Sequence, residues 1–177
     1  TGWSVKETSD TGYIIVGFTE SYDAIENDVL LIKTDSNGNK QWHKTFGGSG
    51  DDIAWSIATN TDDGYTIAAQ TSSLGNGKLD AYLIRTDANG DTLWTRTYGG
   101  PEVDRVFSVD LARDGGILLA GITYSFGAGD RDAYLLKTDN NGKLLWQKTY
   151  GGPGYDNAHA VIVLSLIHIS EPTRQLC

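Results

Sequence analysis

Acidic side chains gather in residues 20–28, which read ESYDAIEND, and this segment is the best local candidate for a cation site. Carboxylate oxygens are the ligands that Ca²⁺ prefers, provided that they converge on one point. The alternative is a solvated acidic loop that binds no metal. The candidate residues of the segment are Glu20, Tyr22, Asp23, Glu26 and Asp28.

A second set of acidic residues recurs at a fixed interval of 52 residues. One series is Asp28, Asp80 and Asp132, and the other is Asp52, Asp104 and Asp156. These carboxylates are potential ligands for calcium or for a sugar. A residue that recurs in every unit usually belongs to the scaffold, so we favour hydrogen bonding to loop amides. Residues outside the period are then the better indicators of function.

The composition argues against several kinds of activity. The only cysteine is Cys177, and neither His43 nor His159 has a visible Ser or Cys partner, so we predict no catalytic residue. With 14 Lys and Arg against 23 Asp and Glu, the net charge of -9 disfavours a nucleic-acid partner. The longest apolar stretch, residues 160–169, falls short of the roughly 20 residues of a membrane-spanning helix. We therefore expect no membrane insertion.

The 52-residue interval organises the whole chain, as Trp42, Trp94 and Trp146 show. Each unit contains four runs rich in β-branched and aromatic residues, bounded by Gly, Asn and Asp, which is typical of strands and turns. In the second unit we expect strands near residues 53–59, 65–71, 81–86 and 92–98. The turn before the last run is Asp-x-Asn-Gly in every unit, and a glycine there can take the positive φ of a tight hairpin.

Four antiparallel strands in each unit of about 50 residues favour the blade of a β-propeller. We predict an all-β, incomplete β-propeller with three four-stranded antiparallel blades, at about 1–48, 49–100 and 101–152, plus the first strand of a fourth at 153–163. A closed ring of six to eight blades would need roughly 310 to 420 residues. The chain is therefore expected to be a fragment whose partners include the missing blades, and its open ends predict self-association.

The last strand of each unit alternates aromatic and cationic residues on one face, such as Trp94, Arg96 and Tyr98. Such a face could be a stacking platform for bases or sugars. Because it recurs in every unit, we favour an interface between blades, with the cations lying over the rings.

The period is lost after Val163, where residues 164–177 read LSLIHISEPTRQLC. Residues 164–174 resemble a sequencing-library adapter translated in one frame. We therefore predict that residues 164–177 are a non-native tail, and we leave them out of the fold and the site.

The repeated motif T-D-x-N-G-x-x-x-W-x-[KR]-T-[YF]-G-G resembles the repeat of secreted bacterial and archaeal β-propeller proteins, and the resemblance covers residues 1–163. A more distant similarity is to the tryptophan-docking repeats of quinone-dependent dehydrogenases. The resemblance implies an extracellular or cell-surface module that binds a protein, a glycan or an adhesion partner. The alternative is part of a glycan-active or quinone-dependent propeller enzyme whose catalytic residues lie in missing blades. No cofactor is evident from the residues, apart from the Ca²⁺ considered above.

In a blade, the loops between the second and third strands share one rim with the loops between successive units. Loops on a rigid scaffold are where propellers usually bind their ligands. The candidate ligand-binding residues on this rim are Glu20, Tyr22, Asp23, Glu26, Asp28, Asp52, Asp80, Asp104, Asp132 and Asp156.

Overall fold

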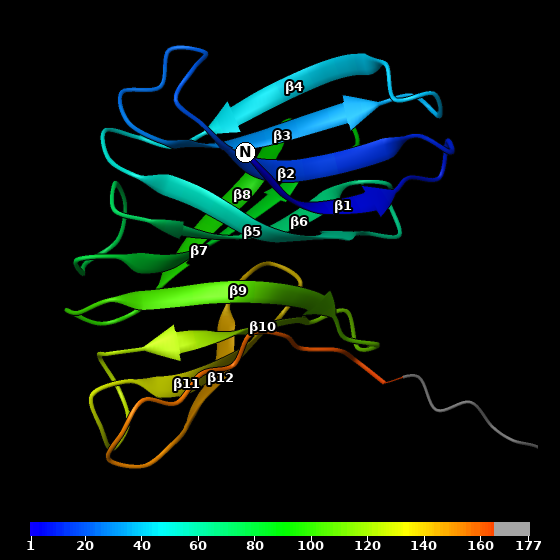
Figure 1. Ribbon diagram of the computed structural model, residues 1–177. Helices are drawn as coiled ribbons and strands as arrows, with labels where there is room; N and C mark the ends of the chain where they lie inside the picture. Colours follow the sequence, from blue (N-terminus) through cyan, green and yellow to red (C-terminus); the bar gives the residue numbers. More distant parts are fainter. Residues whose placement is uncertain (165–177) are drawn as a thin grey trace, which may run out of the picture.

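The computed structural model describes residues 1–164 of the 177-residue chain. In this part the chain is all-β and has no helix, so it contains no helix that could cross a membrane (Figure 1). The prediction of a non-native tail falls almost wholly on residues 165–177, which lie outside the described residues.

The described strands form three four-stranded antiparallel sheets, which confirms the predicted incomplete propeller arrangement. The first sheet contains β1 (Gly2–Glu7), β2 (Tyr13–Thr19), β3 (Asp28–Thr34) and β4 (Lys40–Phe46). The second contains β5 (Asp52–Thr59), β6 (Tyr65–Thr71), β7 (Asp80–Thr86) and β8 (Thr92–Tyr98). The third contains β9 (Asp104–Leu111), β10 (Ile117–Thr123), β11 (Asp132–Thr138) and β12 (Leu144–Tyr150). Within each sheet, strands that follow one another along the chain are paired.

The hairpin between the third and fourth strands of each sheet is closed by an aspartate. In the first sheet, Asp35 Oδ1 accepts hydrogen bonds of 2.9 Å from the backbone N–H groups of Asn37 and Asn39. Gly38 between them has φ +82°, the left-handed conformation that glycine adopts without strain. Asp87 and Asp139 make the same bonds in the other sheets. These carboxylates therefore serve as hairpin caps.

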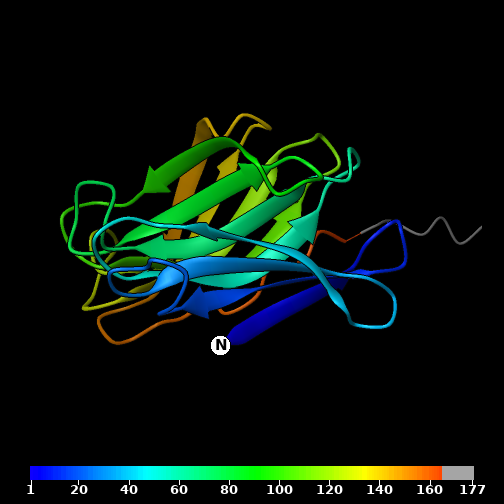
Figure 2. The ribbon, with the colours of Figure 1, turned by 90° about the horizontal axis from the view of Figure 1, so that it is seen from above.

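The three sheets stack face to face, and the hydrophobic core lies between them (Figure 2). Ile14 and Leu31 of the first sheet pack in one core cluster with Ile67 of the second. Leu83 and Leu119 belong to the next cluster, between the second and third sheets. The alternation of strand residues thus supplies two buried faces to the middle sheet, whose strands β6 and β7 are buried along their whole length.

The innermost strands β1, β5 and β9 lie side by side, and each carries a β-bulge (Figure 1). The unpaired residue of the bulge is Trp3, Trp55 or Phe107, and a bulge re-aims the side chain that it carries. The ring centroids of Trp3 and Trp55 are 4.9 Å apart, and those of Trp55 and Phe107 are 5.5 Å apart. His159 continues the column, with its ring stacked on Phe107 at 5.2 Å.

Residues 157–164 lie alongside β9, in the place predicted for the first strand of a fourth unit. The Val161 N–H donates to Ser108 Oγ at 3.2 Å, as the Val109 N–H donates to Ser56 Oγ at 3.3 Å one unit earlier. No strand is formed here, however, because no other described strand pairs with the segment.

The last strand of one sheet also packs on the hairpin of the next sheet. A methyl group on Gly90 would lie 2.8 Å from the Trp42 ring, and one on Gly142 would lie 2.7 Å from the Trp94 ring. The Tyr98 hydroxyl donates to the Gly142 carbonyl at 2.6 Å. These contacts confirm the predicted interface between units.

Candidate functional site

The loops between the second and third strands meet the loops between successive sheets on one side of the molecule, as predicted. The backbone N–H groups of Asp52, Asp104 and Asp156 donate to carbonyls of the preceding sheet's loop, at 2.6, 2.7 and 2.8 Å. We call this side the loop rim, and it lies at the left of Figures 1 and 2. It consists of residues 20–27, 47–51, 72–79, 99–103, 124–131 and 151–155.

The periodic aspartates of the loop rim bind loop donors, as the scaffold interpretation predicts. Asp104 is fully buried and accepts hydrogen bonds from the Gly100 N–H at 2.7 Å, the Ser125 hydroxyl at 2.6 Å and the Thr123 hydroxyl. Asp52 accepts from the Gly48 N–H and a serine hydroxyl in the same way. These hydrogen bonds hold the loops in place, and ligand binding by Asp52 and Asp104 stays a prediction.

The other periodic aspartates also cap backbone amides. Asp80 Oδ2 accepts from the Asn76 and Gly77 N–H groups at 2.8 and 3.1 Å. Asp132 does the same for Ala128 and Gly129. Asp156 Oδ2 accepts from the Gly152 N–H at 2.9 Å.

Asp28 is the exception in its series, because residues 20–27 offer it no capping amide. Its Oδ1 atom and Oδ1 of Asp52 are buried and have no hydrogen-bond partner among residues 1–164. Burial, together with the neighbouring negative charge of Asp52, raises the pKa of Asp28 above its ordinary value. The first loop therefore differs from the other two in its sequence, and it also leaves a buried carboxylate oxygen without a hydrogen bond.

A shallow acidic hollow lies on this part of the loop rim. It is lined by Glu20, Ile25, Glu26, Asn27 and Asp51. Asn27 Nδ2 donates to Asp51 Oδ1 at 2.6 Å. Glu20 and Glu26, both predicted site residues, thus face the same hollow.

The structure does not gather the acidic loop into a metal-ligand set. Residues 1–164 contain no group of three or more His, Cys, Asp or Glu side chains placed to hold a metal ion. Asp23 is absent from the lining of the acidic hollow, and Asp28 faces Asp52 instead. Calcium binding stays a prediction.

Tyr22 and Asp23 are both held in the left-handed region, with φ of 61° and 69°. This conformation costs a non-glycine residue on the order of 1 kcal/mol. The Tyr22 ring lies against the His43 ring of β4, with centroids 4.1 Å apart, which keeps the loop in place. His43 therefore supports the loop.

The opposite end of the loop rim carries an aromatic and cationic cluster that the sequence analysis missed. The guanidinium of Arg131 lies 5.0 Å from the ring centroid of Tyr155 and 5.9 Å from that of Tyr124. Both rings are largely exposed. Arg131 Nε is buried without a hydrogen-bond partner, and no carboxylate in the described chain pairs with Arg131. Arg131 Nη1 donates a hydrogen bond to the Tyr124 hydroxyl at 3.4 Å, so the guanidinium and this ring are held together.

The two ends of the loop rim occupy equivalent positions of the repeat. Residues 52 apart form three series, which are 20, 72 and 124; 27, 79 and 131; and 51, 103 and 155. The backbone is alike in the second and third positions, since Leu79 pairs with Val103 in an isolated parallel bridge, as Arg131 pairs with Tyr155. The chemistry changes along the rim from acidic, through Ser72, Leu79 and Val103, to aromatic and cationic.

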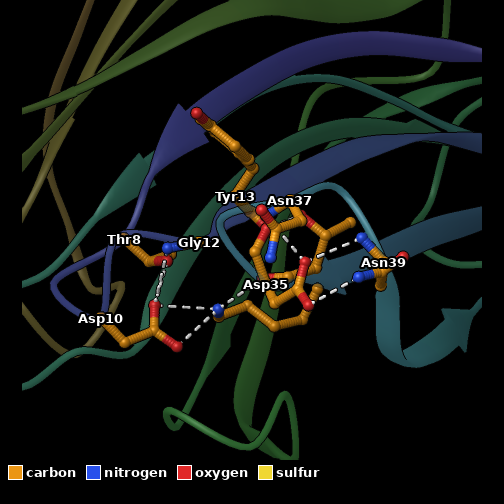
Figure 3. Close-up of polar contacts among 9 residues, drawn as sticks. Thr8, Asp10, Gly12, Tyr13, Asp35, Asn37 and Asn39 are labelled. Carbon is orange, nitrogen blue, oxygen red and sulfur yellow. Dashed lines mark hydrogen bonds and ion pairs between the residues drawn. The ribbon is translucent and has the colours of Figure 1, made fainter.

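The opposite side of the molecule carries the tight turns and a series of ion pairs. Lys33 is buried, and its Nζ atom lies 2.8 Å from Asp10 Oδ2 (Figure 3). Hydrogen bonds from Lys33 and Thr8 lower the pKa of Asp10. Ion pairs between Asp62 and Arg85 and between Asp114 and Lys137 repeat the arrangement. This periodic series is therefore scaffold, and it could have been found from the 52-residue interval.

Comparison with known proteins gives a distant relative and neighbours in fold. No protein family model matches this chain. The regulatory protein FlaEY of Caulobacter vibrioides is 27% identical over 163 residues, covering 78% of this chain and 17% of that protein. A protein of unknown function from Bacteroides caccae has a similar fold, with a TM-score of 0.52 at 12% identity, covering 89% of this chain and 48% of that one. The chain thus spans less than half of either protein.

Proposed function

We propose that this chain is part of a secreted or cell-surface β-propeller protein and acts as a binding module for a protein or glycan through its loop rim. The observation that carries the proposal is the change of side-chain chemistry at equivalent rim positions of the repeat. Asp52, Asp104 and Asp156 each accept a hydrogen bond from a loop amide, whereas the side chains at neighbouring rim positions differ from unit to unit. Such a division is typical of scaffolds that present loops to a ligand.

The departures in the first loop support the same assignment. Left-handed Tyr22 and Asp23, together with the unpartnered oxygen of Asp28, cost stability in the first loop. Locally unfavourable conformations concentrate at functional sites, where the surrounding structure holds them in place. FlaEY is named a regulatory protein, which agrees with a role in binding.

The proposal can be tested by a binding screen that compares the two sides of the molecule. The chain would be applied to a glycan array and to a phage-displayed peptide library. The Glu26→Lys variant alters the loop rim, and Glu7→Lys makes the same charge change on an exposed residue at the opposite side. We expect Glu26→Lys or Tyr155→Ala to abolish binding of a selected ligand and Glu7→Lys to leave it unchanged. Equal binding by all variants with unchanged melting temperatures would refute a loop-rim site.

A further inference from the structure

The stack of sheets ends in two open faces, one on the first sheet and one on the third (Figure 1). On the first sheet, apolar residues of this outer face are exposed or half-buried, although their equivalents one unit later are buried against the first sheet. The outer-face residues are Val5, Tyr13, Ile15, Leu30 and Ile32, and their buried equivalents are Ile57, Tyr65, Ile67, Tyr82 and Ile84. Val5 is 57% exposed, for example, whereas Ile57 is fully buried. The first sheet therefore presents the same face that the second sheet buries.

The outer face of the third sheet carries the other half of the same contact. Within the chain, the first sheet packs on the second through residues that include Ile14, Leu31, Trp42 and Phe46. The equivalents of these residues two units later are Leu118, Leu135, Trp146 and Tyr150, and none of them is buried. Trp146 is 37% exposed and Tyr150 is 58% exposed. The two outer faces are thus complementary, because each matches one side of an interface that the chain forms twice.

The hairpin at Gly38 indicates where the two faces would meet. In the second sheet, a methyl group on the hairpin residue Gly90 would lie 2.8 Å from a tryptophan ring of the preceding sheet, whereas one on Gly38 would have no atom within 4 Å. The Tyr98 hydroxyl donates to the Gly142 carbonyl of the following hairpin, whereas its equivalent Tyr150 is exposed. The first hairpin therefore has room for a tryptophan ring, and its carbonyl can accept a tyrosine hydroxyl.

We infer that this chain pairs with a second copy of itself, and that the outer face of each third sheet packs on the outer face of the other copy's first sheet. Trp146 then lies on the hairpin of Gly38, and the Tyr150 hydroxyl donates to the Gly38 carbonyl, as their equivalents do at Gly142. Two copies supply six sheets, within the roughly four to eight blades of closed propellers, so the contact closes a ring. This inference goes beyond the proposed function, because it concerns two sheet faces and not the loop rim.

Residues 157–163 have to move when the two copies meet. They lie beside β9, where β1 of the other copy would lie, since β1, β5 and β9 are neighbours in this order. No strand of residues 1–164 pairs with them, whereas β1 is paired with β2. Because β1 has more hydrogen bonds to lose, we place β1 of the other copy beside β9. Its Trp3 then takes the position of His159 against Phe107.

Sedimentation velocity runs on the intact chain, over roughly 1 to 100 µM, measure this association. We expect a species with twice the mass of one chain, which dissociates on dilution. A species with the mass of one chain throughout this range would overturn the inference. Assemblies larger than two copies would overturn the closed ring.

Gly38→Asn tests the hairpin contact with little effect on the single chain. Asn tolerates the left-handed region, where Gly38 has φ +82° and open space around it. In the pair the new side chain meets the Trp146 ring, so the dissociation constant should rise at least about tenfold. The matched control is Gly115→Asn, with φ +79° and equally open space, in a turn that lines a pocket with residues of the second sheet. The control should pair normally, and normal pairing of Gly38→Asn would overturn the placement of Trp146.

Two charge variants test the direction of the contact. Trp146→Lys disables the outer face of the third sheet, and Val5→Lys disables that of the first. Each variant alone should stay a single chain, and their equal mixture should form pairs again, because one intact contact forms between them. Leu93→Lys adds the same charge at a 56% exposed residue of the middle sheet and should pair normally. Pairing of Val5→Lys with itself would overturn the contact between third and first sheets.

Val161→Pro tests the position of β1 in the pair. It removes the N–H that donates to Ser108 Oγ and so loosens residues 157–163. Since the segment is then easier to displace, the pair should become about fivefold tighter. A weaker pair would show that residues 157–163 themselves lie at the contact, and would overturn the placement of β1.

Discussion

Removing the carboxylate of Asp104 should strongly destabilise the protein. The side chain is fully buried and accepts three hydrogen bonds, from the Gly100 N–H and from the hydroxyls of Ser125 and Thr123. Asp104→Ala leaves the buried Thr123 hydroxyl and the half-buried donors of Gly100 and Ser125 without their acceptor, and each buried donor left unsatisfied costs about 1–3 kcal/mol. Since the donors can partly rearrange, we expect a total loss of about 3–5 kcal/mol. Asp104→Asn keeps one acceptor oxygen and should lose about 1–3 kcal/mol.

Urea unfolding followed by circular dichroism, at one fixed protein concentration, measures these losses. The matched control is Asp130→Ala, which removes an exposed carboxylate from the loop rim of the same sheet. We expect the control to change the free energy of unfolding by less than about 0.5 kcal/mol. The assignment of Asp104 as a structural cap fails if Asp104→Ala costs no more than the control, or if Asp104→Asn costs more than Asp104→Ala.

Three further changes test other parts of the structure. Burial and Asp52 raise the pKa of Asp28, so the folded state favours its protonated form, and that contribution is lost as the pH rises through the folded-state pKa. Asp28→Asn should therefore stabilise the protein by a few tenths of a kcal/mol at pH 7 and by nothing at pH 3, and an equal gain at both pH values in thermal melts would contradict this. Tyr98→Phe removes the hydrogen bond to Gly142 and should cost about 1 kcal/mol in urea unfolding, whereas Tyr150→Phe, at a 58% exposed residue, should cost nothing measurable. Trp146→Lys at the outer face of the third sheet should reduce self-association in sedimentation velocity runs, and unchanged sedimentation would show that this face is not the contact.

The strands could be predicted from the sequence because the pattern of each strand recurs in all three repeat units. The predicted runs at 65–71 and 92–98 match β6 and β8, and the run at 53–59 lacks only the first residue of β5. Hairpin glycines and the tryptophan contacts between sheets followed from the same interval. The bulges of β1, β5 and β9 did not, because a bulge depends on the pairing register and leaves no residue-type signal of its own.

The site was predicted only in part, for a different reason. Tyr124, Arg131 and Tyr155 lie up to 31 residues apart in the sequence, and only the meeting of two loops brings them together. They do depart from the period, so a comparison of all three units at each position would have found them. The unpartnered oxygen of Asp28 could not be found by such a comparison, because an aspartate stands at this position in every unit. The first unit differs only in the backbone amides that would bind the carboxylate.

The unpartnered oxygen of Asp28 points to a reason for the difference between the first loop and the other two. Asp28 is the same residue as Asp80 and Asp132, but residues 20–27 do not form the glycine-rich turn that caps Asp80 and Asp132. The replacement leaves a buried oxygen of Asp28 without a partner and holds Tyr22 in the left-handed region. Folding alone gains nothing from these changes, since the chain shows twice that it can build the same loop without them. A sequence that breaks its own local rule at one exposed loop does so most readily where the loop has a ligand to bind.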